Sequence, residues 1–308
     1  MSSRFARYGS RALGAALLLA LAGCGGKGTE VDDARVIAEP GTNPSGPGSS
    51  STASTGAPAA ATPAPTASTT AAPAAAVKAE GWGTLKGRVV FDGDPPPQKV
   101  LVAKGSKDAK DAAVCATHEI KAERLVVDSG TKGVKNVIVY IPKPTAVNPE
   151  AKSAKASQTV LFDQKGCVFE PHVLAAMVGE KIDLKSSDPV SHNINCKVQN
   201  NGFNEAVAPN GEIKKQAIAP ARMPGLVTCD IHPWMTAYWL ILDNPYFAVT
   251  DDKGNFEIKN APAGTQKVAV WQEATQFVTP SAGQEVTLAA GGDTSQDFTI
   301  KASQVKPE

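Results

Sequence analysis

The sequence predicts an all-β protein built from sandwiches. From Trp82 onward, the 308-residue chain consists of short stretches of alternating apolar and polar residues, separated by Gly, Pro, Asn and Asp. Such period-two alternation between turn residues is typical of strands. Helical periodicity is present only weakly, over residues 109–118. Many short strands with little helix favour a β-sandwich architecture.

The first 24 residues are typical of an export signal. A basic start through Arg11 is followed by an apolar run over residues 12–21 and by small residues before Cys24. This run is too short to span a bilayer as a mature helix. The ending Leu-Ala-Gly-Cys resembles a bacterial lipobox, which implies that Cys24 is lipidated; secretion with an unmodified Cys24 is the alternative. In the lipoproteins that this motif resembles, Asp directly after the cysteine often marks retention in the inner membrane. Here that residue is Gly25, so the resemblance implies an anchor in the outer membrane, facing the periplasm.

Residues 25–80 are predicted to be a disordered linker. They are mostly Ala, Pro, Ser, Thr and Gly. A segment of this composition buries too little apolar surface to offset the entropy lost on ordering. A flexible chain of this length has a root-mean-square reach of roughly 40 Å. The linker would therefore let a folded region move some distance from the membrane.

Strands are expected along the rest of the chain. The first covers residues 83–91, where Leu85, Val89 and Phe91 share one face. Further strands are expected at residues 124–127, 134–141, 159–162, 178–184 and 237–242. Beyond them the pattern predicts a hairpin over residues 248–258 with its turn at 252–254, a second turn at 262–264, and strands at 267–271 and 297–300.

Two of these stretches resemble a known family. The pattern Thr-Asp-x-x-Gly-x-Phe-x-Ile from Thr250, followed by Pro-x-Gly at residues 262–264, is similar to the second half of a carboxypeptidase regulatory-like domain. The usual opening of that transthyretin-like β-sandwich matches residues 83–89. The resemblance implies a structural or adhesive domain split over residues 81–150 and 245–303, with an insertion between; two sandwiches in series are the alternative.

Four side chains with good metal-donor atoms lie between these halves. Cys229, His232 and Met235 follow one another at three-residue spacing, and His192 lies upstream. Thiolate, thioether and imidazole are ligands that copper prefers. We therefore expect the four to form a mononuclear copper site. Taken singly, they also fit a turn histidine, half of a disulfide or a core methionine, so a fold that binds no metal stays open.

Residues 157–243 resemble a cupredoxin of the plastocyanin and amicyanin kind, which is a Greek-key β-sandwich. The resemblance is carried by His-Asn at residues 192–193 and by Cys-x-x-His-Pro-x-Met at residues 229–235, whose short spacing is most like the amicyanin loop. It implies one type 1 (blue) copper ion, with His192, Cys229 and His232 as equatorial ligands and Met235 as the axial ligand.

The same resemblance gives roles to the neighbours of the ligands. Asn193 should link the two ligand loops by hydrogen bonds, and Pro233 should stiffen the turn because it lacks a backbone N–H. A site held between the geometries preferred by the two copper oxidation states suits electron transfer. An exposed edge of His232, beside Pro233 and Trp234, is the expected docking patch for a periplasmic redox protein.

The remaining cysteines allow three arrangements. In an oxidising compartment Cys115 and Cys167 are expected to form a disulfide, which leaves Cys196 as a buried free thiol. The alternatives are a second, zinc-type site formed by Cys115, Cys167, His118 and His172, and unpaired thiols at Cys115 and Cys167.

Other functions lack a signal in the sequence. The formal net charge is +1, and the part after the export signal carries −2, which argues against nucleic-acid binding. Hydrolase, haem-attachment and phosphate-loop motifs are absent from the sequence. We therefore expect a membrane-tethered electron carrier and no enzyme. The alternatives are a copper-delivery protein and a metal-free scaffolding lipoprotein that binds protein or carbohydrate.

Overall fold

The computed structural model describes residues 80–307. The predicted export signal, Cys24 and nearly all of the predicted linker lie outside the described residues. Within the described part, no helix is both long and apolar enough to cross a membrane.

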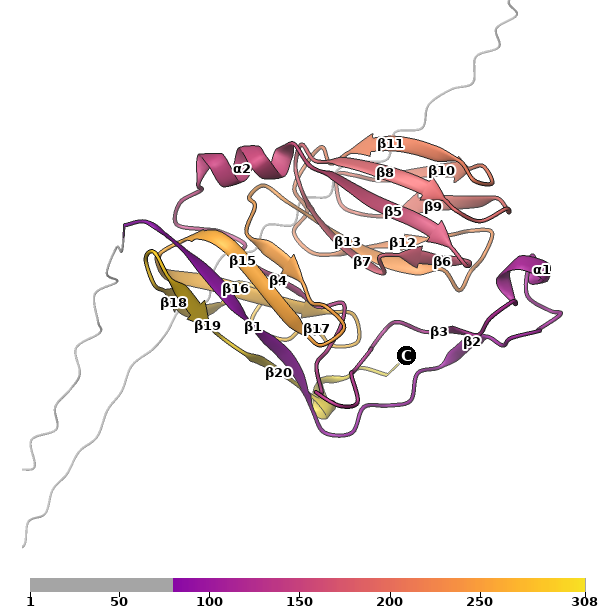
Figure 1. The fold of residues 1–308 in the computed structure, drawn as a ribbon, viewed down its shortest axis with the longest axis horizontal. Helices are drawn as coiled ribbons and strands as arrows, with labels where there is room; N and C mark the ends of the chain where they lie inside the picture. The colour runs from indigo at the N-terminus through magenta and orange to yellow at the C-terminus, as the bar shows by residue number, and fades with distance from the viewer. Residues whose placement is uncertain (1–79, 308) are drawn as a thin grey trace, which may run out of the picture. The chain divides into compact units, whose positions relative to one another are not determined.

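Strands dominate the described residues, so the all-β prediction is confirmed (Figure 1). The helical segments are α1 (Ala112–Cys115), α2 (Pro149–Ala156) and the 3-10 turn η1 (Ala302–Gln304). The strands are β1 (Trp82–Asp92), β2 (Val100–Val102), β3 (Ile120–Lys121), β4 (Ile138–Tyr140), β5 (Thr159–Lys165), β6 (Val168–Glu170), β7 (Val173–Met177), β8 (Lys181–Ser186), β9 (His192–Cys196), β10 (Phe203–Val207), β11 (Glu212–Gln216), β12 (Gly225–Thr228), β13 (Thr236–Leu242), β14 (Phe247–Val249), β15 (Asn255–Pro262), β16 (Gly264–Gln272), β17 (Gln276–Phe277), β18 (Gln284–Leu288), β19 (Asp293–Ser295) and β20 (Phe298–Lys301).

One pair of sheets contains the predicted metal ligands. The first sheet has the order β10-β9-β12-β13-β7 and the second the order β11-β8-β5-β6. Their inner faces enclose a single apolar cluster in which Trp239 packs edge-on against Phe162, at 4.7 Å between ring centroids, and Phe162 stacks on Phe169. Burying large aromatic rings supplies much of the free energy that holds two such sheets together.

A second pair of sheets is built from strands on both sides of this region. β1 pairs with β15, β19 and β20, while β4 pairs with β14 and β16. β1 and β4 precede residue 157, whereas their partners follow residue 243. These sheets enclose a separate apolar cluster that includes Leu85, Val89 and Phe91, the three residues predicted to share one face of the first strand.

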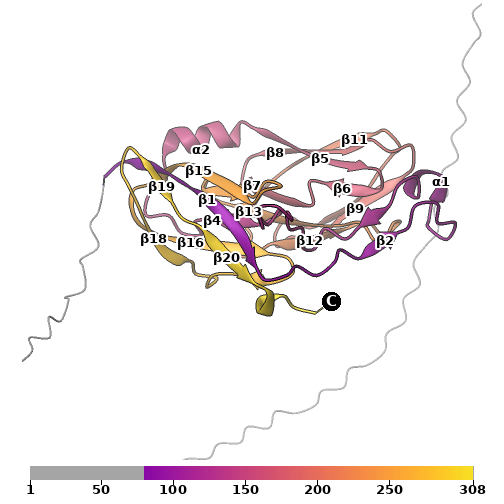
Figure 2. The ribbon, with the colours of Figure 1, turned by 60° about the horizontal axis from the view of Figure 1, so that its bottom comes forward.

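Two contacts connect the sandwiches. A third apolar cluster joins β7 and β13 to β4 and β16, with Met177, Leu240 and Trp271 among its buried members. In addition, residues after β2 leave the second sandwich and pack on the first: Cys115 and Ile120 belong to the same cluster as Trp239. The sequence predicts residues 81–150 in the other sandwich, whereas Cys115 and Ile120 pack here. Figure 2 shows α1 and β2 lying toward the first pair of sheets.

Several predicted elements need correction. Residues 124–127 form no strand and contribute only an isolated bridge at Val127. The strand expected over 178–184 begins at Lys181, because residues 178–180 form a turn. The turn predicted at residues 252–254 is present, because the Asp251 carbonyl accepts the N–H of Gly254. The predicted hairpin over residues 248–258 is wrong, because its two strands join different partners: β14 pairs with β4, and β15 pairs with β1. The turn therefore carries the chain from one sheet to the other.

Helix α2 was not predicted from the sequence. Asn148 caps it by accepting the N–H groups of Glu150 and Ala151, and Pro149 occupies the first helical position, where it suits a helix start. None of its eight residues is buried. A helix without an apolar face gives no hydrophobic periodicity, which explains why the pattern missed it.

Glu180, in the turn before β8, gives a pH-dependent stability prediction. Its side chain is fully buried, and this burial raises the pKa of the carboxyl, although the Met177 N–H and Lys155 partly oppose the shift. A carboxyl with a raised folded-state pKa makes folding less favourable once the pH rises through its pKa values. We expect Glu180→Gln to raise the melting temperature at neutral pH and to lose this effect as the pH falls below about 4, where the unfolded side chain is also protonated.

The matched control is Glu285→Gln, an exposed glutamate in β18. Its melting temperature should follow that of the unchanged protein at every pH. A Glu180→Gln protein that is less stable at neutral pH would contradict this prediction. It would show that the ion pair with Lys155 makes the buried carboxylate favourable for folding.

Candidate metal centre

Strand pairing brings the predicted ligands together from two parts of the chain. Cys229 follows β12, and His232 and Met235 lie in the turn between β12 and β13. His192 is the first residue of β9, which runs antiparallel to β12 and pairs Asn195 with Thr228. The start of β9 therefore lies beside the end of β12.

The side chains of His192, Cys229 and His232 form a compact cluster. One ring nitrogen from each histidine and the sulfur of Cys229 all lie within 4.8 Å of one another. The two imidazole centroids are 4.6 Å apart, and the Cys229 sulfur lies 3.8 Å from Nδ1 of His232. Both histidines are 0% exposed and Cys229 is 2% exposed. The arrangement has the donor types and the spacing of a small metal site.

Met235 closes the same loop. Its N–H donates to the His232 carbonyl at 2.9 Å, and its own carbonyl accepts the N–H of Cys229 at 3.2 Å. The side chain is 1% exposed and packs in the apolar cluster of this sandwich. These backbone bonds hold Met235 beside Cys229 and His232. Its role as axial ligand stays a prediction.

A carboxylate fixes the orientation of each histidine ring. Nε2 of His192 lies 3.0 Å from Asp188 Oδ2, and Nε2 of His232 lies 3.0 Å from Asp111 Oδ2. A carboxylate can only accept a hydrogen bond, so Nε2 of each ring carries a proton and Nδ1 is the ring nitrogen that could bind a metal. Metal-bound histidines are commonly held by such an outer hydrogen bond.

An unpaired polar atom supports the fit to a metal. Nδ1 of His192 is buried and has no hydrogen-bond partner within residues 80–307. Leaving a buried polar atom unpaired costs about 1–3 kcal/mol. A cation bound among this nitrogen, Cys229 and His232 would satisfy it, so the donor set fits the ion that the sequence predicts.

The electrostatics of the cluster favour a thiolate. Burial opposes ionisation of Cys229, but the adjacent His192 and His232 rings outweigh it and lower the pKa of the thiol to about 6. Burial would likewise lower the pKa of His192, yet Asp188 and Cys229 raise it to about 9. The thiolate is the form of cysteine that binds metals.

Asn193 links the two ligand loops, as the resemblance implies. Its Oδ1 accepts the N–H of Asp230 at 2.7 Å and lies 3.4 Å from the Cys229 sulfur. Its Nδ2 donates to the Asp230 carboxylate and to Asn204 Oδ1, each at 2.8 Å. One buried amide therefore fixes the backbone that follows Cys229 relative to the strand that begins with His192.

The expected exposed edge of His232 is wrong. The ring is fully buried, and its outer nitrogen bonds to Asp111, in the segment between β2 and β3. Pro233 is exposed, while Trp234 is half-buried and donates its indole N–H to the Cys167 carbonyl at 3.0 Å. The ring is buried because the segment between β2 and β3 packs over this end of the sandwich. The resemblance to cupredoxins gives no indication of that segment.

Cys115 and Cys167 form a disulfide, with their Cα atoms 5.3 Å apart. Their sulfurs are therefore not thiolates, and the alternative zinc-type site does not form: His118 is exposed, while His172 bonds to Glu273 at 2.7 Å. Cys196 is a buried free thiol whose burial raises its pKa to about 11, so it stays protonated.

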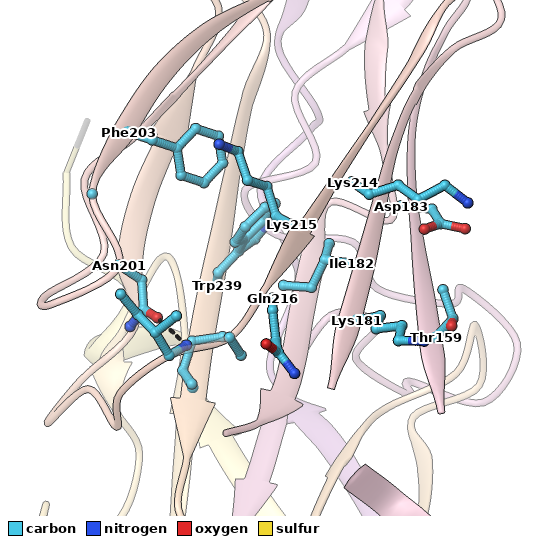
Figure 3. A pocket seen from close by; sticks show the side chains of 14 residues that line it. Thr159, Lys181, Ile182, Asp183, Asn201, Phe203, Lys214, Lys215, Gln216 and Trp239 are labelled. Carbon is cyan, nitrogen blue, oxygen red and sulfur yellow. Dashed lines mark hydrogen bonds between the residues drawn. The ribbon is translucent and has the colours of Figure 1, made fainter. Parts of the chain in front are cut away.

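A hollow elsewhere in this sandwich is separate from the centre. It encloses about 710 Å³ and is lined by residues of β8, β10, β11 and β13 (Figure 3). The Lys215 ammonium lies 4.9 Å from the Phe203 ring centroid there and pairs with Glu205. None of the four predicted ligands lines it.

Asp188 and Asp111 are the site residues that sequence reasoning missed. Asp188 lies four residues before His192, so local spacing could have suggested it. Asp111 lies 121 residues before His232, and nothing in the sequence connects the two.

Comparisons with known proteins give only distant, partial matches to solved structures. No family model and no curated protein matches the chain. A copper(I) form of an amicyanin variant matches with 12% identity and a TM-score of 0.25, over 33% of this chain and 97% of amicyanin. A purple cupredoxin from Nitrosopumilus maritimus matches with 17% identity and a TM-score of 0.23, over 27% of this chain and 98% of the other.

A third match differs in coverage. A copper-containing nitrite reductase from Thermus scotoductus SA-01 shares 20% identity with a TM-score of 0.25, over 27% of this chain, but the chain covers only 22% of the reductase. Likeness at these values supports no functional statement by itself. The case for a metal therefore rests on the side chains at this site.

Asn193 provides a test of how the site is held. Asn193→Ala would remove the buried amide that accepts the part-buried N–H of Asp230, so we expect a loss of about 1–3 kcal/mol in the free energy of unfolding. Urea unfolding of the metal-free protein measures it. The control is Asn195→Ala on the same strand, because the Asn195 side chain donates only to the Asp230 carboxylate within the described residues, at 3.0 and 3.2 Å. Equal losses in the two variants would contradict a special role for Asn193.

Proposed function

We propose that this protein binds one copper ion as a type 1 centre and carries single electrons. His192, Cys229 and His232 would be the equatorial ligands and Met235 the axial one. The observation that carries the proposal is the buried cluster of two imidazoles and a thiol, in which both Nε2 atoms are held by carboxylates and Nδ1 of His192 is unpaired.

Copper bound here would supply a one-electron couple, which an electron carrier requires. The protein would contribute rigidity. Asp188 and Asp111 hold the two rings, Asn193 holds the loop after Cys229, and the Met235 backbone closes the turn. Ligands that cannot rotate keep the geometry the same in both oxidation states, which lowers the energy of reorganisation.

The same features favour a carrier over an enzyme. With four ligands assigned, no coordination position is left for a substrate. All four side chains are at most 2% exposed, so a small molecule has no direct access to the donor atoms. Burial also opposes easy transfer of the metal to another protein, which a delivery protein would need.

The proposal includes a location. A lipid at Cys24 would hold the protein at the periplasmic face of a bacterial membrane, and the Ala/Pro-rich linker would let the folded part reach a periplasmic redox partner. With the His232 edge covered, we propose docking beside the half-buried Trp234, whose ring centroid lies 5.3 Å from that of His232.

Copper loading tests the central claim. We expect the purified protein to bind one Cu(II) with an intense visible band from thiolate-to-copper charge transfer, which bleaches on reduction and returns on oxidation. Cys229→Ser should abolish the band, because the thiolate is its source. The matched control is Cys196→Ser, at the other buried free thiol, which should keep the band.

Two other results would replace the proposal. Tight, colourless Cu(I) binding with rapid transfer to a chelator would indicate copper delivery. Failure to bind any metal in stoichiometric amount, with Cys229 oxidised, would indicate a metal-free scaffolding protein.

Met235→Leu tests the axial ligand. Leucine has a similar volume, so the buried cluster should tolerate it at a cost below about 1.5 kcal/mol. If the thioether is a weak ligand, its removal should keep the visible band and raise the reduction potential, because the axial donor favours Cu(II). Voltammetry measures the potential. An unchanged potential would make Met235 an ordinary core residue.

A further inference from the structure

The segment that covers His232 is residues 103–118, here called the cap. It connects β2 to β3 and contains α1. Cys115 and Ala116 of the cap are buried in the apolar cluster of the sandwich that holds the predicted ligands. The cap is therefore packed onto that sandwich, at the end where the ligand loop lies.

Asp111 in the cap has an unusual conformation. It precedes α1 at the N-cap position, where an aspartate normally accepts a backbone N–H of the first helical turn, yet its side chain makes no such bond. Its backbone is left-handed, with φ 53° and ψ 43°, a conformation that non-glycine residues seldom adopt. The carboxylate instead reaches Nε2 of His232 at 3.0 Å. The Asp111 side chain thus bonds to a residue distant in sequence and makes no capping bond to α1.

A disulfide anchors this arrangement. Cys115, four residues after Asp111, is bonded to Cys167. The N–H groups of Gly166 and Cys167 donate to the Asp188 carboxylate, which also holds His192. One covalent link thus connects the segments that position the carboxylates of both histidines.

We propose that Asp111 is a positioning residue that fixes the His232 ring with Nδ1 inward and closes the outer edge of the metal centre. The effect on copper rests on the proposed function, whereas the effect on the ring is a property of the protein without metal. Asp111 would stabilise Cu(II) over Cu(I), because its carboxylate places a negative charge beside the ligand His232. The cap would also slow the escape of the ion.

Three variants separate these effects. Asp111→Ala removes both the acceptor and the charge. Asp111→Asn keeps an oxygen acceptor for Nε2–H and removes only the charge. Asp108→Asn is the matched control, because it changes the net charge equally from an exposed position three residues away in the cap.

The first measurement uses metal-free protein. Nitrogen-15 NMR of the His232 ring, at a pH where the ring is neutral, reports which nitrogen carries the proton. We expect the Nε2–H form alone in the unchanged protein, Asp111→Asn and Asp108→Asn, and a mixture of both forms in Asp111→Ala. The Nε2–H form alone in a folded Asp111→Ala protein would overturn the positioning role.

The second measurement uses copper-loaded protein. Losing an outer carboxylate changes metal affinity by about 10- to 100-fold. A tenfold greater loss of Cu(II) than of Cu(I) affinity corresponds to a rise of about 59 mV in the reduction potential. We expect a rise of this order in both Asp111 variants, none in Asp108→Asn, and faster copper loss to a chelator in Asp111→Ala. Equal potentials in Asp111→Asn and Asp108→Asn would overturn the electrostatic part.

The two proposals can fail separately. If the unchanged protein binds no copper, the proposed function fails, and the NMR measurement still decides whether Asp111 positions His232. If Asp111→Ala does not fold, the potential of Asp111→Asn still decides whether the carboxylate acts on the bound ion.

Discussion

The arrangement of the sandwich that carries the His192, Cys229 and His232 cluster depends on keeping one buried thiol between two imidazoles. Cys229 cannot move far, because the backbone after it is bonded to Asn193 and its own N–H is bonded to Met235. The bond to Asn193 needs β9 and β12 to be neighbours in register, whereas the bond to Met235 lies within the turn between β12 and β13. The sheet order, in which β9 lies between β10 and β12, is therefore a condition for the site as well as for the fold.

The histidines are fixed by a different principle. Each ring is held from outside by a carboxylate, and both carboxylates are tied to the same disulfide region: Asp188 through the N–H groups of residues 166–167, Asp111 through the cap that contains Cys115. The second pair of sheets contributes indirectly, because the cap follows β1 and β2 in the chain. The four predicted ligands all lie within residues 157–243, whereas the carboxylate that holds His232 is Asp111, from a segment earlier in the chain.

This difference explains what the sequence could predict. The ligand loop was accessible because Cys229, His232 and Met235 are close in sequence and chemically distinctive. Asn193 was accessible through its resemblance to a known motif. Asp111 was not, because its partner lies 121 residues away and no local pattern distinguishes it from Asp108. Similarly, the turn at residues 252–254 followed from local residue preferences, but which sheet each flanking strand joins depends on long-range pairing that no local pattern encodes.

The cap also changes how an electron would leave a metal bound here. With Nε2 of His232 engaged by Asp111, the histidine edge offers no contact surface. The Trp234 ring is close to His232 and reaches the surface, where it lines a cleft of about 200 Å³ together with Pro233 and Met235. The cleft is also lined by Glu123 and Glu273 and by the apolar side chains of Ile120 and Phe169, so carboxylates and apolar groups face the same space. A partner that docked there would meet the ligand loop on the side of the thioether, and the cap would exclude it from the side of the imidazole. The segment that positions His232 would then also determine the face on which electrons are exchanged.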